Sequence, residues 1–100
     1  MNDDDDNYDH LLMWIDARLD ELLDNPFLYV QSIESLEDQF VVLLEMRDQV
    51  TNSHCTLLVD FRLFLKKKFK LDHAPPLSKI TQDLDQIVKV LRDFRLTFIN

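Results

Sequence analysis

The sequence contains no glycine. Loops that cradle phosphate groups need glycine, because only glycine lets the backbone approach the anion closely. The absence therefore excludes a P-loop and a Rossmann dinucleotide site. Without glycine, we expect helices to end on asparagine or aspartate and sharp turns to be few, which favours an all-α fold.

Cysteine and long apolar runs are also scarce. The single cysteine, Cys55, excludes an intramolecular disulfide and a cysteine-rich zinc site. His10, His54 and His73 have no metal-binding spacing, so we expect no metal and no cofactor. No apolar run approaches the ~18 residues of a membrane span, and the acidic start does not resemble a signal peptide. We therefore expect a cytoplasmic protein that binds no membrane.

Positive charge is in deficit, because 19 acidic and 11 basic residues give a formal net charge of −8. Contacts with phosphate need a positive surface, so this balance disfavours a protein that binds nucleic acid. Residues 3–6 are four aspartates, and residues 1–7 are predicted to form a disordered acidic tail. With the first helix, these aspartates suit one functional hypothesis, an acidic inhibitor that mimics nucleic acid.

An apolar stripe over residues 33–64 is the longest regular pattern. Its members recur at alternating spacings of three and four residues, as on one helical face turned to a core. Residues 51–53, Thr-Asn-Ser, have low helix propensity, and we predict that they divide the stripe between two helices. The alternative is a three-helix arrangement with one long central helix over residues 35–70. The members of the stripe are Ile33, Leu36, Phe40, Leu43, Arg47, Val50, His54, Leu57, Phe61 and Phe64.

Helical spacing also occurs before and after this stripe, so residues 8–100 are predicted to form a single all-α domain. Four helices of similar length predict an antiparallel four-helix bundle. Residues 27–30 are expected to cover one end of the core. The predicted helices span residues 8–24, residue 32 or 35 to 50, residues 54–70, and residue 77 or 78 to the end of the chain.

Several apolar residues fall outside the inward stripes. Met13 and Trp14 lie on the nominal solvent side of the first helix, and Val59 and Leu63 form a second ridge one turn apart. Exposed apolar groups of this kind mark contact surfaces, so we predict that these four residues bind another protein. A homodimer is a further expectation. The principal functional hypothesis is a small acidic protein-interaction module without catalytic activity, such as an adaptor, chaperone, immunity-type inhibitor or regulator.

Arg47 and His54 interrupt the apolar stripe one heptad apart. On a structural interpretation, Arg47 pairs with an acid on its own or another helix, or both side chains reach water at the end of the bundle. Arg47, followed by Asp48 and then His54, also resembles the Arg-x(4–6)-His motif of HEPN-domain ribonucleases and toxins, which are small all-α dimers. The resemblance implies that Arg47 binds the scissile phosphate and His54 transfers a proton. A HEPN-like, metal-independent ribonuclease is therefore the alternative function.

Overall fold

The computed structural model describes residues 3–51 and 56–99, and these residues contain six helices and no strand. The predicted all-α class is confirmed. Two of the helices are single turns, α2 (Pro26–Tyr29) and α5 (Leu77–Ile80). The four long helices are α1 (Asp3–Asp24), α3 (Ile33–Thr51), α4 (Thr56–Phe69) and α6 (Leu84–Phe98).

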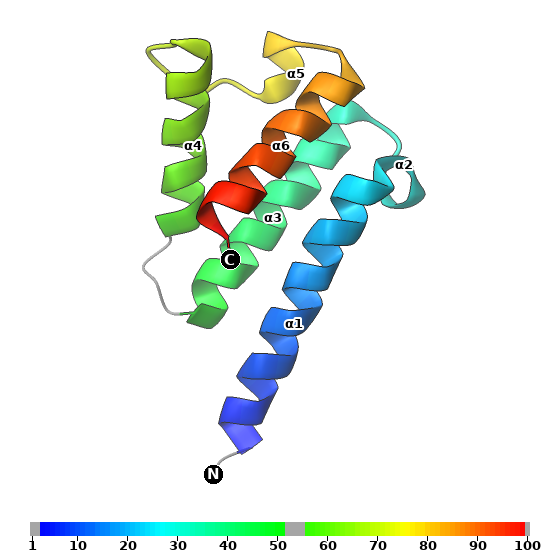
Figure 1. Ribbon diagram of the computed structural model, residues 1–100, viewed down its shortest axis with the longest axis vertical. Helices are drawn as coiled ribbons and strands as arrows, with labels where there is room; N and C mark the ends of the chain where they lie inside the picture. Colours follow the sequence, from blue (N-terminus) through cyan, green and yellow to red (C-terminus); the bar gives the residue numbers. More distant parts are fainter. Residues whose placement is uncertain (1–2, 52–55, 100) are drawn as a thin grey trace.

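The four long helices lie side by side, and successive long helices run in opposite directions (Figure 1). α1 contacts α3 and α6, and α4 also contacts α3 and α6. α1 and α4 therefore lie on opposite sides of the molecule, with α3 and α6 between them (Figure 1). The molecule is elongated, with principal extents of 47 × 30 × 18 Å.

Three phenylalanines from three different helices form the centre of the core. Phe40 of α3, Phe61 of α4 and Phe94 of α6 are at most 2% exposed. Their ring centroids lie 5.1 to 6.2 Å apart in tilted or edge-to-face orientations, which aromatic rings favour. α1 adds Ile15 and Leu19, which are fully buried. All four long helices thus share one core.

The stripe over residues 33–64 faces this core, as its spacing predicted. Leu36 and Phe40 are buried on α3, and Leu57 and Phe61 are buried on α4. α3 ends at Thr51, the first residue of the predicted interruption, and α4 begins at Thr56 and runs in the opposite direction (Figure 1). The alternative of one long helix over residues 35–70 is therefore wrong. Residues 52–55 lie outside the described residues.

Polar side chains satisfy the first amides of two long helices. Ser32 Oγ accepts the N–H of Ser35 at 3.1 Å, as expected for an N-cap residue of α3. Asp48 of α3 accepts the N–H of Leu57 at 3.1 Å and that of Leu58 at 3.3 Å. These amides belong to the first turn of α4, where no helical carbonyl reaches them. Asp48 therefore fixes the start of α4 against the end of α3.

The end of α4 departs from the sequence-based expectation. Lys70 has a φ of 55°, in the left-handed region. The N–H of Leu71 donates to the carbonyl of Lys66 at 2.9 Å, the bond that closes a Schellman-type helix end. Glycine usually takes this position because it has no Cβ. The expectation that helices end on asparagine or aspartate is therefore wrong for α4.

The predicted start of the first helix is also wrong. α1 begins at Asp3, so the segment predicted as a disordered tail over residues 1–7 is helical from residue 3. The sequence places four aspartates in this first turn. Negative charge at a helix N-terminus interacts favourably with the helix dipole, which offsets the low helix propensity of aspartate.

The last predicted helix is divided in two. α5 ends at Ile80 and α6 begins at Leu84. Asp83 caps α6, because its side chain accepts the N–H of Asp85 at 3.1 Å. The N–H of Asp83 in turn donates to Thr81 Oγ1 at 3.1 Å. The apolar spacing continues through this segment, but two cap-forming side chains stop the helix there.

Candidate interaction surfaces

The outward side of α4 carries the apolar ridge that the sequence predicted. Val59 is 54% exposed and Leu63 is 52% exposed. The two residues are one helical turn apart, so their side chains are neighbours. Three basic residues and one acidic residue share this side of the helix. We define the α4 face as Val59, Asp60, Arg62, Leu63, Lys66 and Lys67.

Hollows flank this ridge on both sides. A hollow of about 760 Å³ opens next to Leu63 and toward the end of α6, and a hollow of about 350 Å³ opens toward the loop after α4. Leu63 and Lys66 line both of them. A concave apolar surface with a few charged groups is typical of binding sites. The larger hollow is lined by Asp60, Leu63, Phe64, Lys66, Lys67, Lys68, Leu71 and Phe98. The smaller one is lined by Val59, Arg62, Leu63, Lys66, Asp72, His73 and Ala74.

Aromatic rings form part of the wall of the larger hollow. The ring centroids of Phe64 and Phe98 lie 6.0 Å apart, in an edge-to-face orientation. Lys68 Nζ lies 5.7 Å from the Phe64 centroid and 3.6 Å from Asp93 on α6. Lys68 is therefore engaged within the molecule. Among the described residues, neither Lys66 nor Lys67 forms an ion pair, so their charges are available to a partner.

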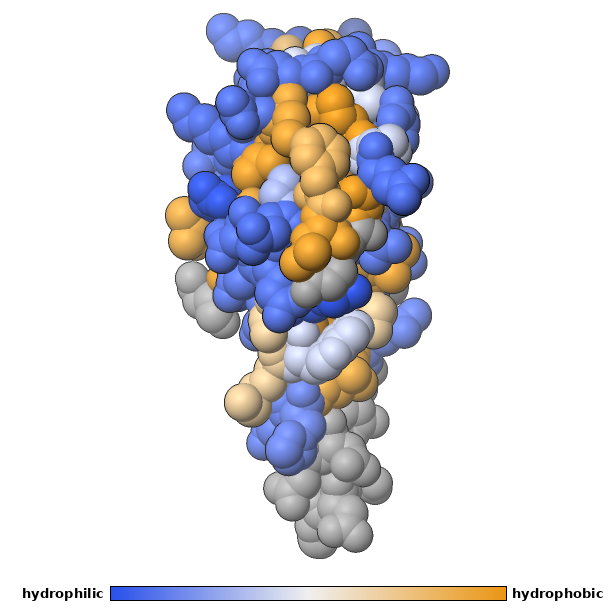
Figure 2. All heavy atoms as spheres, turned by 90° about the vertical axis from the view of Figure 1, so that its right-hand side faces the viewer, coloured by the Kyte–Doolittle hydropathy of each residue, from blue (hydrophilic) through white to orange (hydrophobic). Residues whose placement is uncertain are grey.

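The outward side of α1 carries the other two predicted binding residues. Met13 is 69% exposed and Trp14 is 51% exposed. Figure 2 looks onto the side of the molecule that α1 occupies and shows apolar atoms among hydrophilic ones. The exposed residues that share this side of the helix contain four acids and no lysine or arginine. We define the α1 face as Asp9, His10, Met13, Trp14, Ala17, Asp20, Glu21 and Asp24.

Ion pairs attach α1 to the neighbouring helices. Three aspartates at intervals of four residues on α1 each meet an arginine from α3 or α6. One of these arginines is Arg47, whose side chain is mostly buried, so the structural interpretation of Arg47 as a partner of an acid on another helix is confirmed. The pairs are Arg47–Asp16 at 3.0 Å, Arg95–Asp20 at 3.3 Å and Arg92–Asp24 at 3.5 Å.

The Arg47–Asp48 part of the HEPN-like motif has structural partners at both positions. Arg47 donates to Asp16, and Asp48, which is 1% exposed, caps α4. His54, the third member of the motif, lies outside the described residues. The catalytic hypothesis for Arg47 and His54 therefore stays a prediction.

α2 exposes two residues that were expected to cover the core. Phe27 is 59% exposed and Leu28 is 70% exposed, whereas Val30 is buried. Val30 follows α2 in an extended conformation, so the residue that covers the core here lies just after the helical turn and not within it. Phe27 lines a hollow of about 620 Å³ together with residues of α6, among them Leu84 and Val88.

Glu37 is, with Asp48, one of two buried carboxylates among the described residues. Its Oε1 accepts the N–H of Leu77 at 2.7 Å, which joins α3 to the start of α5. Burial raises the pKa of Glu37 above its ordinary value of 4.5, and the hydrogen bond from Leu77 opposes this effect only in part. The sequence held one signal, because Glu37 lies one heptad before the buried Leu44 and so on the same side of α3.

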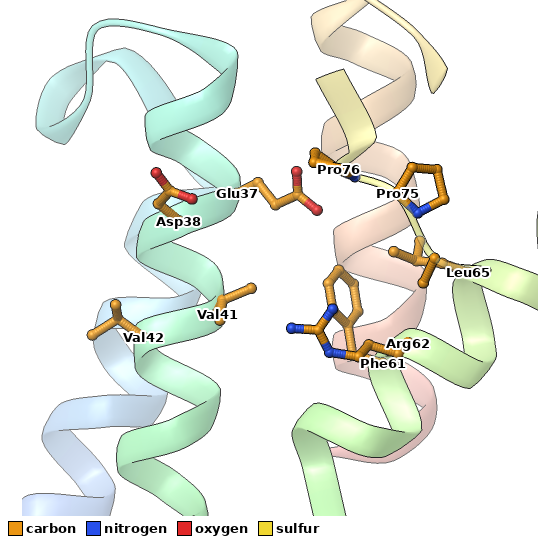
Figure 3. A pocket seen from close by; sticks show the side chains of 10 residues that line it. Glu37, Asp38, Val41, Val42, Phe61, Arg62, Leu65, Pro75 and Pro76 are labelled. Carbon is orange, nitrogen blue, oxygen red and sulfur yellow. The ribbon is translucent and has the colours of Figure 1, made fainter. Parts of the chain in front are cut away.

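The carboxylate of Glu37 borders a hollow of about 320 Å³ between α3 and α4. Figure 3 shows the Glu37 side chain reaching from α3 toward Pro76, with Arg62 of α4 on the other side of the hollow. The rest of the lining is largely apolar. The lining residues are Glu37, Asp38, Val41, Val42, Phe61, Arg62, Leu65, Ala74, Pro75 and Pro76.

No family model, no curated protein and no solved structure matches the chain. In the described part of the chain, no helix has both the length and the apolar character needed to cross a bilayer. The same residues hold no group of three or more His, Cys, Asp or Glu side chains placed to bind a metal ion.

Proposed function

We propose that this chain is a small protein-interaction module, built as an antiparallel four-helix bundle, and that the α4 face is its principal binding surface. The observation that carries the proposal is the exposure of Val59 and Leu63 between two hollows. Apolar side chains on a concave surface, with charged groups at the edge, match the composition of protein interfaces.

Energetics favours this surface as the site of binding. Covering the exposed half of a Val or Leu side chain stabilises a complex by about 1 kcal/mol, at about 25 cal/mol per Å² of apolar area. Phe64 and Phe98 in the adjoining hollow add aromatic area that a partner can cover. Lys66 and Lys67 stand at the edge of the same hollow, where they select for a partner with negative charge.

The pairing of Arg47 with Asp16 supports a structural role for that residue in place of phosphate binding. Asp16 accepts the Nε–H of Arg47 at 3.0 Å, and this ion pair attaches α3 to α1. In this proposal the module acts by binding, and the HEPN-like activity of Arg47 and His54 stays the alternative prediction.

Affinity capture with variants tests the binding surface. The double variant Val59→Gln/Leu63→Gln removes the apolar ridge, and glutamine keeps a high helix propensity, so the fold is expected to persist. Leu28→Gln is the matched control, because Leu28 is exposed on α2, outside the α4 face. We expect proteins captured by the wild type to be retained by the control and lost by the double variant. Equal capture by all three proteins would contradict the assignment of the α4 face.

A further inference from the structure

We infer that copies of this chain associate head to tail, with the α1 face of one copy seated on the α4 face of the next. This inference rests on the proposed function, because it names an occupant of the α4 face. The two faces lie on opposite sides of one molecule (Figure 1), so each copy offers both halves of the contact. A contact between different faces is heterologous and extends from copy to copy.

Each face combines exposed apolar residues with charged ones. On the α1 face, Asp20, Glu21 and Asp24 pair with Arg95, Arg18 and Arg92, and Asp9 forms no ion pair among the described residues. Met13 and Trp14 lie in a segment where residues 1–17 contain no lysine or arginine and residues 3–6 are four aspartates. Val59 and Leu63 are followed by residues 61–71, which contain five basic residues and no acid. Opposite charges at the edge of an interface attract and orient the partners.

When α1 of one copy and α4 of the next run antiparallel, the distance between the acidic and apolar residues on α1 matches the distance between the basic and apolar residues on α4. Asp9 precedes the Met13–Trp14 pair by about 7 Å, at about 1.5 Å per residue. The lysines Lys66 and Lys67 follow the centre of the Val59–Leu63 ridge by about 8 Å on the same measure. Apolar residues therefore meet apolar residues in the register that brings acids to lysines. In this register the dipoles of the two helices also oppose one another.

A symmetric contact of the α4 face with itself is disfavoured by charge. The face holds the basic residues Arg62, Lys66 and Lys67 against one acid, Asp60. Pairing two such faces brings like charges together, which costs free energy. The heterologous contact instead brings Asp9 of the α1 face to the lysines of the α4 face.

Trp14 is the side chain that fits the larger hollow beside Leu63. The hollow holds about 760 Å³, more than an indole ring occupies, and its walls include Phe64 and Phe98. Tryptophan is among the residues that contribute most to protein interfaces. Its exposure in the isolated chain, 51%, leaves the ring accessible to a second copy.

Two double variants separate the two halves of the contact. Met13→Gln/Trp14→Gln removes the apolar part of the α1 face and keeps the α4 face. Val59→Gln/Leu63→Gln does the reverse. All four residues are exposed, so the variants are expected to fold, and circular dichroism verifies this. Leu28→Gln is the control that leaves both faces intact.

Sedimentation velocity over a range of concentrations measures the association of the wild type, the control and the two double variants. We expect the wild type and the control to form assemblies that grow beyond the dimer, and each double variant to weaken association by about tenfold or more. An equimolar mixture of the two variants restores one intact contact and stops at a 1:1 dimer. Added salt weakens every association, because the edge of the contact is charged.

Other outcomes overturn the inference. If Met13→Gln/Trp14→Gln forms the same dimer as the wild type, the α4 face pairs with itself and the head-to-tail contact is wrong. If the wild type stays monomeric at all concentrations, no second copy occupies the α4 face. In that case the affinity capture with Val59→Gln/Leu63→Gln still decides the proposed function, so the two claims fail separately.

Discussion

Two buried carboxylates on α3, one near each end of the helix, each accept backbone amides at the start of another helix, but from different numbers of donors. Asp48 is 1% exposed and accepts two amides at the start of α4. Glu37 is 9% exposed and accepts one amide, from Leu77, at the start of α5. Burial of a charge is costly unless donors surround it. Two amide donors therefore compensate the burial of Asp48, whereas one amide donor compensates that of Glu37, and we expect Asp48 to be the stronger anchor.

The two carboxylates also differ in their relation to the proposed binding surface. Asp48 fixes the start of the helix that carries Val59 and Leu63, whereas Glu37 borders the loop of Pro75 and Pro76. The firmly held helix presents the α4 face. The loop after α4 lines the smaller hollow, and its end is attached to α3 by the hydrogen bond between Leu77 and Glu37.

The largest expected effect comes from removing the firm anchor. Asp48→Ala leaves the amides of Leu57 and Leu58 without this acceptor, and we expect the free energy of unfolding to fall by about 2 kcal/mol. Asp48→Asn keeps one oxygen acceptor and is expected to lose about half as much. Urea denaturation followed by circular dichroism measures both. Equal stability of Asp48→Ala and the wild type would show that α4 does not depend on this cap.

A smaller effect is expected at the exposed cap of α6. Asp83→Ala removes the acceptor of the Asp85 amide, which water can replace because both residues are exposed. We expect a loss of about 1 kcal/mol, near the typical value for a helix cap. The same urea titration gives this number beside that of Asp48→Ala. A loss at Asp83 larger than at Asp48 would reverse the proposed role of burial.

We expect Glu37 to make the stability of the protein depend on pH. Because the pKa of Glu37 is raised in the folded state, folded protein binds more protons than unfolded protein above pH 4.5, and stability falls as pH rises through the window up to the folded pKa. Glu37→Gln keeps an oxygen for Leu77 but does not ionise. We expect its stability relative to the wild type to increase from pH 4.5 to pH 7 in urea titrations. A difference that is constant with pH would contradict the shift at Glu37.

The apolar spacing of the sequence predicted the core well. The stripe over residues 33–64 identified Leu36, Phe40, Leu57 and Phe61 as inward residues, because alternating spacings of three and four place them on one helical side. The low helix propensity of Thr51 and its neighbours also indicated where the stripe divides. Patterns of this kind depend only on neighbours in sequence.

Helix ends that depend on distant or competing groups could not be predicted in the same way. Glu37 and Leu77 are forty residues apart, so their bond depends on the folded arrangement of α3 and α5. Lys70 adopts a left-handed conformation that its residue type does not signal. The cap at Asp83 was hidden because the apolar spacing continues through it.

The candidate site was predicted in part. Sequence periodicity placed Met13, Trp14, Val59 and Leu63 outside the core, and all four are exposed. The hollows beside Leu63 could not be foreseen, because α6 and the loop after α4 form their walls. The opposite positions of α1 and α4 likewise follow only from the packing order of the helices.

The central claim is that the α4 face binds a second copy of the chain through Val59 and Leu63. The most direct measurement compares the sedimentation of Val59→Gln/Leu63→Gln with that of the wild type at equal concentration and ionic strength. The account predicts assemblies for the wild type and association weaker by about tenfold or more for the folded variant. Equal sedimentation coefficients for the two proteins, at concentrations where the wild type associates, would contradict it.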